Sequence, residues 1–358
     1  MTPEKIESNA LLPSTPGALG YRFPAEWEKH SATWLSYPHD DSYSWPGTLP
    51  RIFPYFNRFI LEISRGERVN INVRDEALKI KVKCDLTEAG VDLSQITLFI
   101  HPTNDAWCRD HGPAFLTNPA SADPRIIVSW KYNAWGEKYP HDLDELIPGM
   151  IGRYLNIPVF YPGIVMEGGA VDFNGKGTLL TTTQCLLHPN RNPQLTQPEI
   201  ETFLRDFYGV EQILWLGEGI EGDDTNGHID DMTRFFREDA VVTMVETRKK
   251  DPNHSILEKN LKTLKTFRLM NGKQPDIAEI PMPKPVIYEN QRLPASYANF
   301  YISNHSVIVP LFRCREDDRA MRILEECFPD RKIEGIDSVE LIWGLGSFHC
   351  LSQQEPAL

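Results

Sequence analysis

The chain has 358 residues, 41% of them hydrophobic and 24% charged, a balance typical of a globular protein and unlike that of disordered, collagen-like or coiled-coil chains. Its net charge of −13 repels nucleic-acid phosphates, and the longest basic run, residues 248–250, is too short to compensate, so we expect no nucleic-acid partner. The six cysteines lack CxxC spacing, which argues against a zinc ribbon or a disulfide scaffold and predicts free thiols.

The first twelve residues lack the basic and then apolar pattern of a secretory signal. No run approaches the ~18 apolar residues of a membrane span. We therefore expect a cytoplasmic protein without a membrane partner. Residues 1–20 are predicted to form an N-terminal arm and residues 21–358 a single domain, because no linker or low-complexity tract divides them. The sequence leaves open whether the protein forms a homo-oligomer.

Runs rich in β-branched and aromatic residues predict strands, and apolar residues at helical spacing predict helices. In chain order we expect a strand at 32–37, helix 53–64, strand 69–73, helix 76–89, strands 96–100, 126–132 and 178–182, helix 198–207, strands 213–216 and 241–245, helix 256–269, strands 286–289, 300–303 and 307–311, and helix 317–327. Residues 189–198 and 272–285 are expected to be long surface loops or connections. These elements predict an α/β fold.

Five compact polar segments interrupt this pattern, and each lies beside an apolar strand. They are residues 107–113 (WCRDHGP), 166–169 (MEGG), 226–230 (NGHID), 296–300 (SYANF) and 346–350 (GSFHC). Their spacing of roughly 50 to 70 residues suits one ββαβ unit each, and five such units would bring the segments to one centre. The segments are too dissimilar to establish a repeat, so five unrelated loops remain the alternative.

The segment 226–230 pairs an imidazole with a carboxylate. If it is extended, His228 and Asp230 project from one face and Ile229 faces a core. The acidic neighbours Asp223, Asp224, Asp230 and Asp231 predict a raised pKa and a protonated His228 near neutral pH. A solvent-facing strand is one alternative. A metal site is another, but HxxxH, HExxH and calcium-loop spacings are absent.

The remaining segments contain further reactive groups. Asp110 lies beside Trp107 and a Gly-Pro turn, and a carboxylate behind an aromatic wall suits a planar cation such as guanidinium, which two carboxylates can hold. A surface pair of Arg109 and Asp110 is the alternative. Glu167 precedes two glycines that let other backbone approach. Cys350 follows a glycine-rich turn that could expose it, although a single cysteine more often packs inertly.

A family resemblance rests on these segments together with residues 24–28 (PAEWE), 104–113 (NDAWCRDHGP), 224–230 and 295–300. From about Tyr21 to Gln354, the chain resembles the agmatine deiminase family, together with its bacterial peptidyl-arginine deiminase relatives. The resemblance implies the pentein fold, a five-bladed pseudo-symmetric α/β propeller of ββαβ units with its active site at the centre. One position departs from the pattern. The usual triple-glycine turn contains Leu345, which is tolerated if its φ is negative.

The resemblance also implies Cys350 as the nucleophile, His228 as the acid/base and Glu167 as the group that orients His228. Asp110 and Asp230 would together form the guanidinium clamp. Asn299 is expected to contact the substrate or support the site. Asp105 and Trp107 are assigned to the distal end of the substrate from their proximity in sequence. The acidic clamp should hold the pKa of Cys350 high until a cationic substrate binds.

The expected reaction is hydrolytic deimination of agmatine to N-carbamoylputrescine and ammonia, through a covalent thiouronium intermediate and without a metal or organic cofactor. The expected cytoplasmic location favours agmatine. The alternative is a deiminase acting on free or peptidyl arginine, although no arginine is evident that would bind the carboxylate of free arginine. A non-catalytic binding protein and a metal-dependent hydrolase are the other classes. Retention of all five polar segments argues against a pure binding protein.

Overall fold

The computed structural model describes residues 14–40 and 42–358, and within them the strands form five mixed sheets and one small hairpin. This confirms the predicted α/β class. No helix in these ranges is long and apolar enough to cross a bilayer. Of the predicted N-terminal arm, residues 1–13 lie outside the described chain. Gly17, further along it, donates from its backbone N to Asp206 O at 2.7 Å.

The first sheet joins the two ends of the described chain. Strand β1 (His30–Ser36) pairs antiparallel with β18 (Ser352–Pro356) and parallel with β2 (Arg68–Val73), and β2 pairs parallel with β3 (Ile96–Ile100). Helices α1 (Leu49–Ser64) and α2 (Glu76–Glu88) connect the parallel strands. Because β18 starts two residues after Cys350, this pairing fixes the end of the segment that carries the thiol.

Each of the other four sheets is an antiparallel pair extended by a parallel strand, which a helical crossover brings alongside. The elements in order are β4 (Ala114–Thr117), β5 (Arg125–Val128), α5 (Ile147–Leu155) and β6 (Val159–Phe160); β7 (Val171–Phe173), β8 (Thr178–Thr182), α7 (Gln197–Tyr208) and β9 (Gln212–Leu216); β10 (Thr233–Arg237), β11 (Ala240–Val245), α8 (Pro252–Leu264) and β12 (Asp276–Pro281); and β15 (Tyr301–Ile302), β16 (Ser306–Leu311), α9 (Glu316–Cys327) and β17 (Lys332–Asp337).

Shorter elements lie between these units. They are the helices α3 (Cys108–His111), α4 (Ala134–Glu137) and α6 (Thr183–Leu186), the hairpin β13 (Ile287–Tyr288) and β14 (Gln291–Arg292), and the 3-10 turns η1 (Leu93–Gln95), η2 (Asp144–Leu146), η3 (Gly168–Ala170), η4 (Ile229–Asp231), η5 (Tyr297–Asn299) and η6 (Leu341–Gly344). Four of the five polar segments found in the sequence coincide with α3, η3, η4 and η5. The fifth follows η6.

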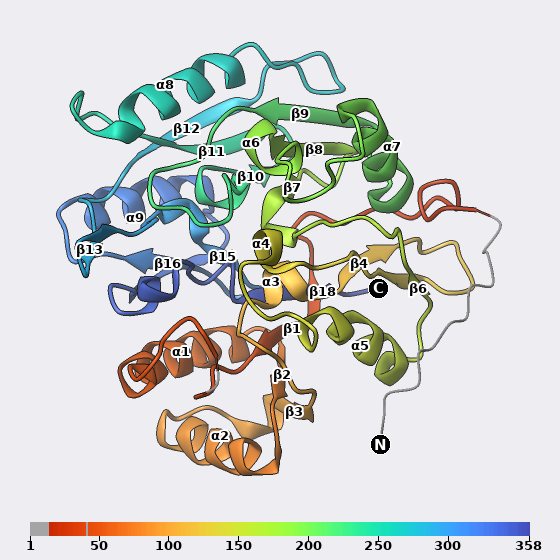
Figure 1. Ribbon diagram of the computed structural model, residues 1–358, viewed down its shortest axis with the longest axis vertical. Helices are drawn as coiled ribbons and strands as arrows, with labels where there is room; N and C mark the ends of the chain where they lie inside the picture. Colours follow the sequence, from red (N-terminus) through yellow and green to blue (C-terminus); the bar gives the residue numbers. More distant parts are fainter. Residues whose placement is uncertain (1–13, 41) are drawn as a thin grey trace.

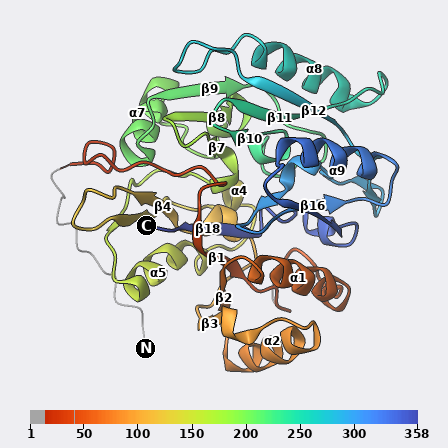
Figure 2. The same ribbon diagram turned by 180° about the vertical axis from the view of Figure 1, so that it is seen from behind.

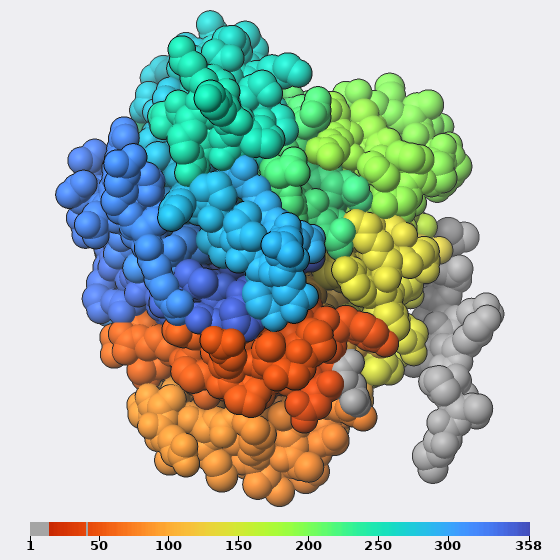
Figure 3. Space-filling view, turned by 60° about the vertical axis from the view of Figure 1, so that its left-hand side comes forward, coloured from red at the N-terminus to blue at the C-terminus, as the bar shows by residue number. Residues whose placement is uncertain are grey.

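The sheets follow one another around the molecule in chain order. Figure 1 shows α3 and α4 near the middle, with the sheets arranged about them, and Figure 2 shows the same order from behind. In Figure 3 the sequence colours likewise succeed one another around the visible face, from orange through yellow, green and teal to blue. The short elements α3, η3, η4 and η5, which carry four of the polar segments, therefore lie together in the interior, although they are far apart in sequence.

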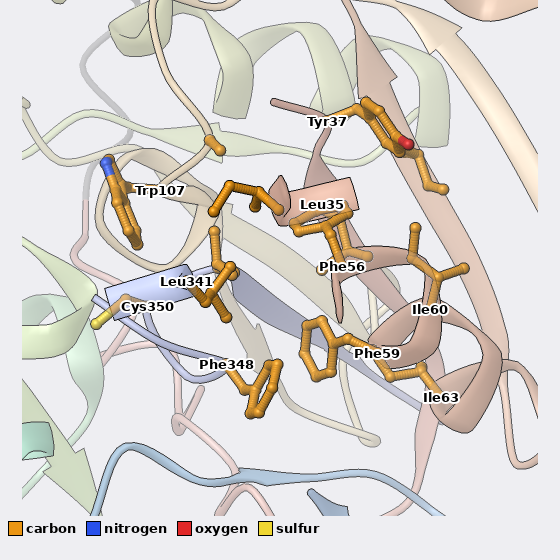
Figure 4. Packing of buried hydrophobic residues seen from close by; sticks show 14 of the residues in the cluster. Leu35, Tyr37, Phe56, Phe59, Ile60, Ile63, Trp107, Leu341, Phe348 and Cys350 are labelled. Atoms are coloured by element: carbon orange, nitrogen blue, oxygen red, sulfur yellow. The ribbon is translucent and has the colours of Figure 1, made fainter. Parts of the chain in front are cut away.

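The core beneath the first sheet anchors the C-terminal segment. Helix α1 presents one apolar stripe, and Phe59 and Phe348 have ring centroids 4.7 Å apart. Figure 4 shows Phe348 facing Phe59 while Cys350 lies at the edge of the cluster, on the side of Trp107. The packed phenylalanine thus holds the backbone two residues before the thiol.

Two predicted loops need correction. Residues 272–285 contain β12, which pairs parallel with β11. It was missed because it lies at the edge of its sheet and its first four residues are only partly buried or exposed, which weakens the apolar signal. Residues 189–196, before α7, are irregular as expected, but Arg191 and Asn192 are buried. The other residues of this segment are exposed or half-buried, so the surface loop needs one correction, which is that two of its side chains reach the interior.

Candidate active site

Cys350 is buried, with 5% of its surface exposed, so the expected exposed thiol is wrong. Its Sγ lies 3.0 Å from Asn299 Nδ2 and 3.7 Å from Asp230 Oδ2, and its backbone N donates to Asn299 Oδ1 at 3.3 Å. Burial, together with the charges of Asp230, Asp231 and Asp110, raises the pKa of the thiol well above its usual value. This agrees with the expected suppression of the thiolate in the free protein.

His228 lies at the start of η4, so the extended strand expected here is wrong. The turn nevertheless leaves His228 and Asp230 fully buried near each other, with Ile229 in the core. His228 Nδ1 is 4.0 Å from Asp230 Oδ1 and 3.8 Å from Asp110 Oδ1, and Nε2 is 4.0 Å from Glu167 Oε2. Neither ring nitrogen has a hydrogen-bond partner in the described chain.

The pKa of His228 is lowered to about 3, which contradicts the raised value predicted from its acidic neighbours. Burial is the largest cause, and it outweighs the attraction of Asp230. One of the acidic neighbours also forms an ion pair with another residue, since Asp224 Oδ1 lies 2.9 Å from Lys138 Nζ. The imidazole is therefore neutral in the free protein and able to accept a proton.

The two carboxylates of the expected clamp meet at Gly169. Asp110 Oδ1 accepts from Gly169 N at 2.9 Å, and Asp110 Oδ2 accepts from Trp135 Nε1 at 3.0 Å. A Cβ on Gly169 would lie 2.6 Å from His228 Nδ1, 2.9 Å from Asp110 Oδ1 and 3.0 Å from Asp230 Oδ2. Only glycine leaves room at this point for the three groups to approach one another.

The environments of the two aspartates push their pKa values apart. For Asp110, burial and the charges of Asp230 and Glu167 raise the pKa well above its usual value. For Asp230, burial acts in the same direction, but the hydrogen bond and charge of His349 outweigh it and lower the pKa. The surroundings of the free site therefore favour the charged form of Asp230 over that of Asp110.

Glu167 is bound by an arginine that the sequence did not indicate. Arg191 Nε donates to Glu167 Oε1 at 2.6 Å, and both side chains are fully buried. Arg191 also donates to Thr225 O at 2.7 Å and to Asn226 Oδ1 at 2.8 Å. The pair leaves Glu167 Oε2 as the oxygen nearest His228. No sequence motif marks Arg191. It follows a histidine and an asparagine in an irregular segment.

A pocket opens onto Cys350 and Asp110. Its wall includes Trp107, Trp135 and Tyr139, and Asp105 lies within it. The residues assigned to the distal end of the substrate, Asp105 and Trp107, thus share one cavity with the thiol. Burial raises the pKa of Asp105 to about 6. No arginine or lysine is among the described residues that line this pocket.

The turn before Cys350 differs from expectation at Leu345, whose φ is +71° and not negative. This left-handed conformation costs a non-glycine residue about 1–2 kcal/mol. The flanking glycines are required by close contacts, because a Cβ on Gly344 would lie 2.5 Å from the Trp45 ring and one on Gly346 would lie 2.4 Å from the Trp107 ring. Leu345 also lines the pocket.

Among the residues that the structure describes, two groups of side chains have ligand atoms close enough together for a metal ion. They are Glu167, Cys185 and His228, and Asp230, Asp231 and Cys350. Neither donor set fits one well. The Arg191 guanidinium already occupies Glu167, and burial raises the pKa of the Cys185 and Cys350 thiols well above usual, so neither supplies the thiolate that a metal prefers. The arrangement better suits a cationic substrate held by carboxylates.

Comparison with known proteins gives one consistent result. Residues 22–356 match the family described as Porphyromonas-type peptidyl-arginine deiminase. A Legionella pneumophila protein, provisionally named an agmatine deiminase, is 34% identical over 96% of this chain and 97% of its own length. The solved agmatine deiminase of Enterococcus faecalis superposes with a TM-score of 0.89 at 31% identity, covering 97% of this chain and 98% of that one.

A second solved structure is a cysteine-to-serine variant of the C. jejuni agmatine deiminase with substrate bound. It superposes with a TM-score of 0.85 at 30% identity and covers 94% of this chain and 96% of that one. These likenesses extend over nearly the whole length of both proteins, so they include all five polar segments.

Proposed function

This chain belongs to the Porphyromonas-type peptidyl-arginine deiminase family, and we propose that it hydrolyses agmatine to N-carbamoylputrescine and ammonia. The observation that carries the choice of substrate is the pocket above Cys350. It contains carboxylates and aromatic rings but no arginine or lysine among its described lining residues. The α-carboxylate of free arginine would find no cation there, whereas the distal ammonium of agmatine would meet Asp105.

The guanidinium is proposed to lie between Asp110 and Asp230 with its carbon facing Cys350 Sγ. Binding of the cation favours the ionised form of Asp110 and lowers the pKa of the Cys350 thiol. In the free protein, burial and neighbouring carboxylates oppose both of these negative charges. Neutral His228 accepts the thiol proton, and the sulfur forms a bond to the guanidinium carbon. The displaced C=N electron pair moves to nitrogen and gives a tetrahedral adduct.

The protonated His228 then returns its proton to a terminal nitrogen. The C–N bond breaks, ammonia leaves, and a thiouronium remains on Cys350. Water next attacks the same carbon and gives a proton to His228. The C–S bond breaks and the C=O of the ureido product forms. His228 returns its proton to the sulfur, and the hydroxyl proton of the adduct passes to solvent, where the released ammonia becomes ammonium. Glu167 stabilises and orients the imidazolium formed in each half, and Asn299, which contacts Cys350 Sγ, positions the sulfur.

The five mixed sheets are proposed to be the blades of a pentein propeller, in a single catalytic domain that spans residues 21–358. Four sheets share one ββαβ connectivity and the first includes the last strand, which is how a ring of blades is closed. The cytoplasmic location, the N-terminal arm and a homo-oligomer remain predictions from the sequence.

A ureido-product assay tests the proposal on agmatine, free arginine and a blocked arginine peptide. We expect turnover of agmatine above both alternatives and its loss in Cys350→Ser, with Cys84→Ser as the control because Cys84 is exposed and distant in the fold. Turnover of the peptide but not agmatine would replace the substrate and retain the thiol chemistry. Equal turnover by wild type and Cys350→Ser would refute the thiol mechanism.

A further inference from the structure

His349, next to the thiol, bridges two carboxylates. Its Nδ1 lies 2.6 Å from Asp230 Oδ2, and its Nε2 lies 2.8 Å from Glu26 Oε2. All three residues are buried. Glu26 comes from the PAEWE segment near the start of the described chain, a motif to which the proposed reaction gives no role. A residue more than three hundred positions away is thus joined to the clamp through one imidazole.

A neutral imidazole has only one N–H donor, and both ring nitrogens of His349 face carboxylate oxygens. The triad therefore needs an imidazolium or a protonated carboxylate. Glu26 is held as the anion, because its Oε2 also accepts from Arg234 at 2.9 Å and from Arg109 at 3.3 Å, and its Oε1 accepts from Ile302 N at 2.8 Å. Although burial opposes it, Arg234, His349 and Arg109 together lower the pKa of Glu26 well below usual.

Charge balance in this buried cluster also favours the imidazolium. The anions are Glu26, Asp230 and Asp172, and the last of these pairs with Arg234 Nε at 2.7 Å. Arg109 and Arg234 supply two cations, and a protonated His349 supplies the third. Burial and neighbouring carboxylates raise the pKa values of Asp110 and Asp231 well above usual, which opposes further negative charge close to the site.

We propose that Glu26 and His349 are positioning residues, which keep Asp230 ionised and turn its free oxygen toward the guanidinium. This inference rests on the proposed deimination and explains why the pKa of Asp230 is lowered while that of Asp110 is raised. His349 ties down Oδ2 of Asp230, while Oδ1 has no partner in the described chain. A guanidinium N–H needs such a fixed and unoccupied oxygen as its acceptor.

Glu26→Gln and His349→Gln test the role, and Asp172→Asn is the matched control. Asp172 is a carboxylate of the same buried cluster, but its oxygens accept from Arg234 Nε and Phe235 N and not from His349. Each variant loses one charge from the cluster, so all three should be destabilised. Thermal unfolding measures that shared loss, which lets the effects on catalysis be compared at known stability.

The first readout is kcat/KM for agmatine against pH. Loss of the cation beside Asp230 makes this carboxylate easier to protonate. Because Asp105 and Asp110 also titrate on the acidic side, each profile is divided by that of the wild type, and the acidic limb of the His349→Gln ratio should show a further loss of about tenfold. Glu26→Gln should show a smaller loss in the same limb. Asp172→Asn should keep the limb of the wild type. A His349→Gln limb that coincides with that of Asp172→Asn overturns the proposal.

The second readout does not depend on turnover. Nitrogen NMR of histidine-labelled protein, with the signal assigned by its loss in His349→Gln, should show both His349 ring nitrogens protonated in the folded free protein, because each faces a carboxylate oxygen. A neutral His349 in the wild type overturns the proposal whatever the variants do to turnover. Ammonia release from agmatine by the wild type tests the proposed function separately, so failure of one is distinguishable from failure of the other.

Discussion

Arg191 and Glu167 form a fully buried ion pair beside His228, with Nε and Oε1 2.6 Å apart. The arginine comes from the irregular segment before α7 and the glutamate from the start of η3. Because the pair occupies one carboxylate oxygen, the other is left facing the imidazole at 4.0 Å. The orientation of the proposed acid/base therefore depends on a residue that carries no sequence motif.

Arg191→Gln should leave the Glu167 carboxylate buried without its cation. Breaking a buried pair from one side typically costs about 3–5 kcal/mol, and we expect a loss of that order in the free energy of unfolding. Turnover should also fall, because Glu167 would no longer be fixed. Denaturant unfolding and the ureido assay measure the two effects. The double variant Glu167→Gln/Arg191→Gln should recover stability but not activity; if it is no more stable than Arg191→Gln, the unpaired charge is not the cause.

Gly169→Ala should abolish activity. The added methyl would overlap His228, Asp110 and Asp230, whose polar atoms lie within 3.0 Å of the Cβ position. Overpacking costs about 1–3 kcal/mol of stability, but the main effect should be on kcat/KM, since all three displaced groups belong to the proposed site. Gly149→Ala is the control, because its Cβ would meet only the ends of two side chains, nearest the Tyr161 hydroxyl at 3.1 Å. Equal activities for the two variants would contradict the assigned geometry.

Iodoacetamide should label Cys350 slowly near neutral pH and faster as pH rises. Burial and nearby carboxylates raise its thiol pKa, so the reactive thiolate is scarce until high pH. Exposed Cys84 serves as the internal reference, and peptide mass spectrometry separates the two sites. Cys84 should be labelled first at every pH below the Cys350 pKa. Thiolate-like labelling of Cys350 at about pH 6 would show that substrate is not needed to activate it.

Agmatine binding to the Cys350→Ser variant should strengthen as pH rises through about 6. That is the raised pKa of Asp105, and an ammonium binds the ionised carboxylate, so affinity is lost as the pH falls below this value. Calorimetry across the range measures the step. Asp105→Asn should remove it, while any further gain at higher pH should persist, because Asp110 also releases a proton on binding. A step that survives in Asp105→Asn would assign the distal amine to another residue.

Many elements were predictable because their signals are local. The apolar stripe of α1 and the β-branched run of β11 identify these elements without reference to the rest of the chain. Short strands were missed, including β4, β7 and β18, because runs of three to five residues leave too little periodicity. The polar strand β18 is identifiable only from its pairing with β1, which lies at the opposite end of the described chain.

The sequence by itself determined which chemical groups are available, because the ordered polar segments and their family resemblance name Cys350, His228, Glu167, Asp110 and Asp230. Only the tertiary structure decided their protonation. Acidic neighbours of His228 in sequence suggested a cation, but burial, which is absent from the sequence, makes it neutral. The same holds for Arg191 and Glu26, whose partners lie far along the chain. Desolvation and Coulomb energy depend on distance in space, so folding alone sets them.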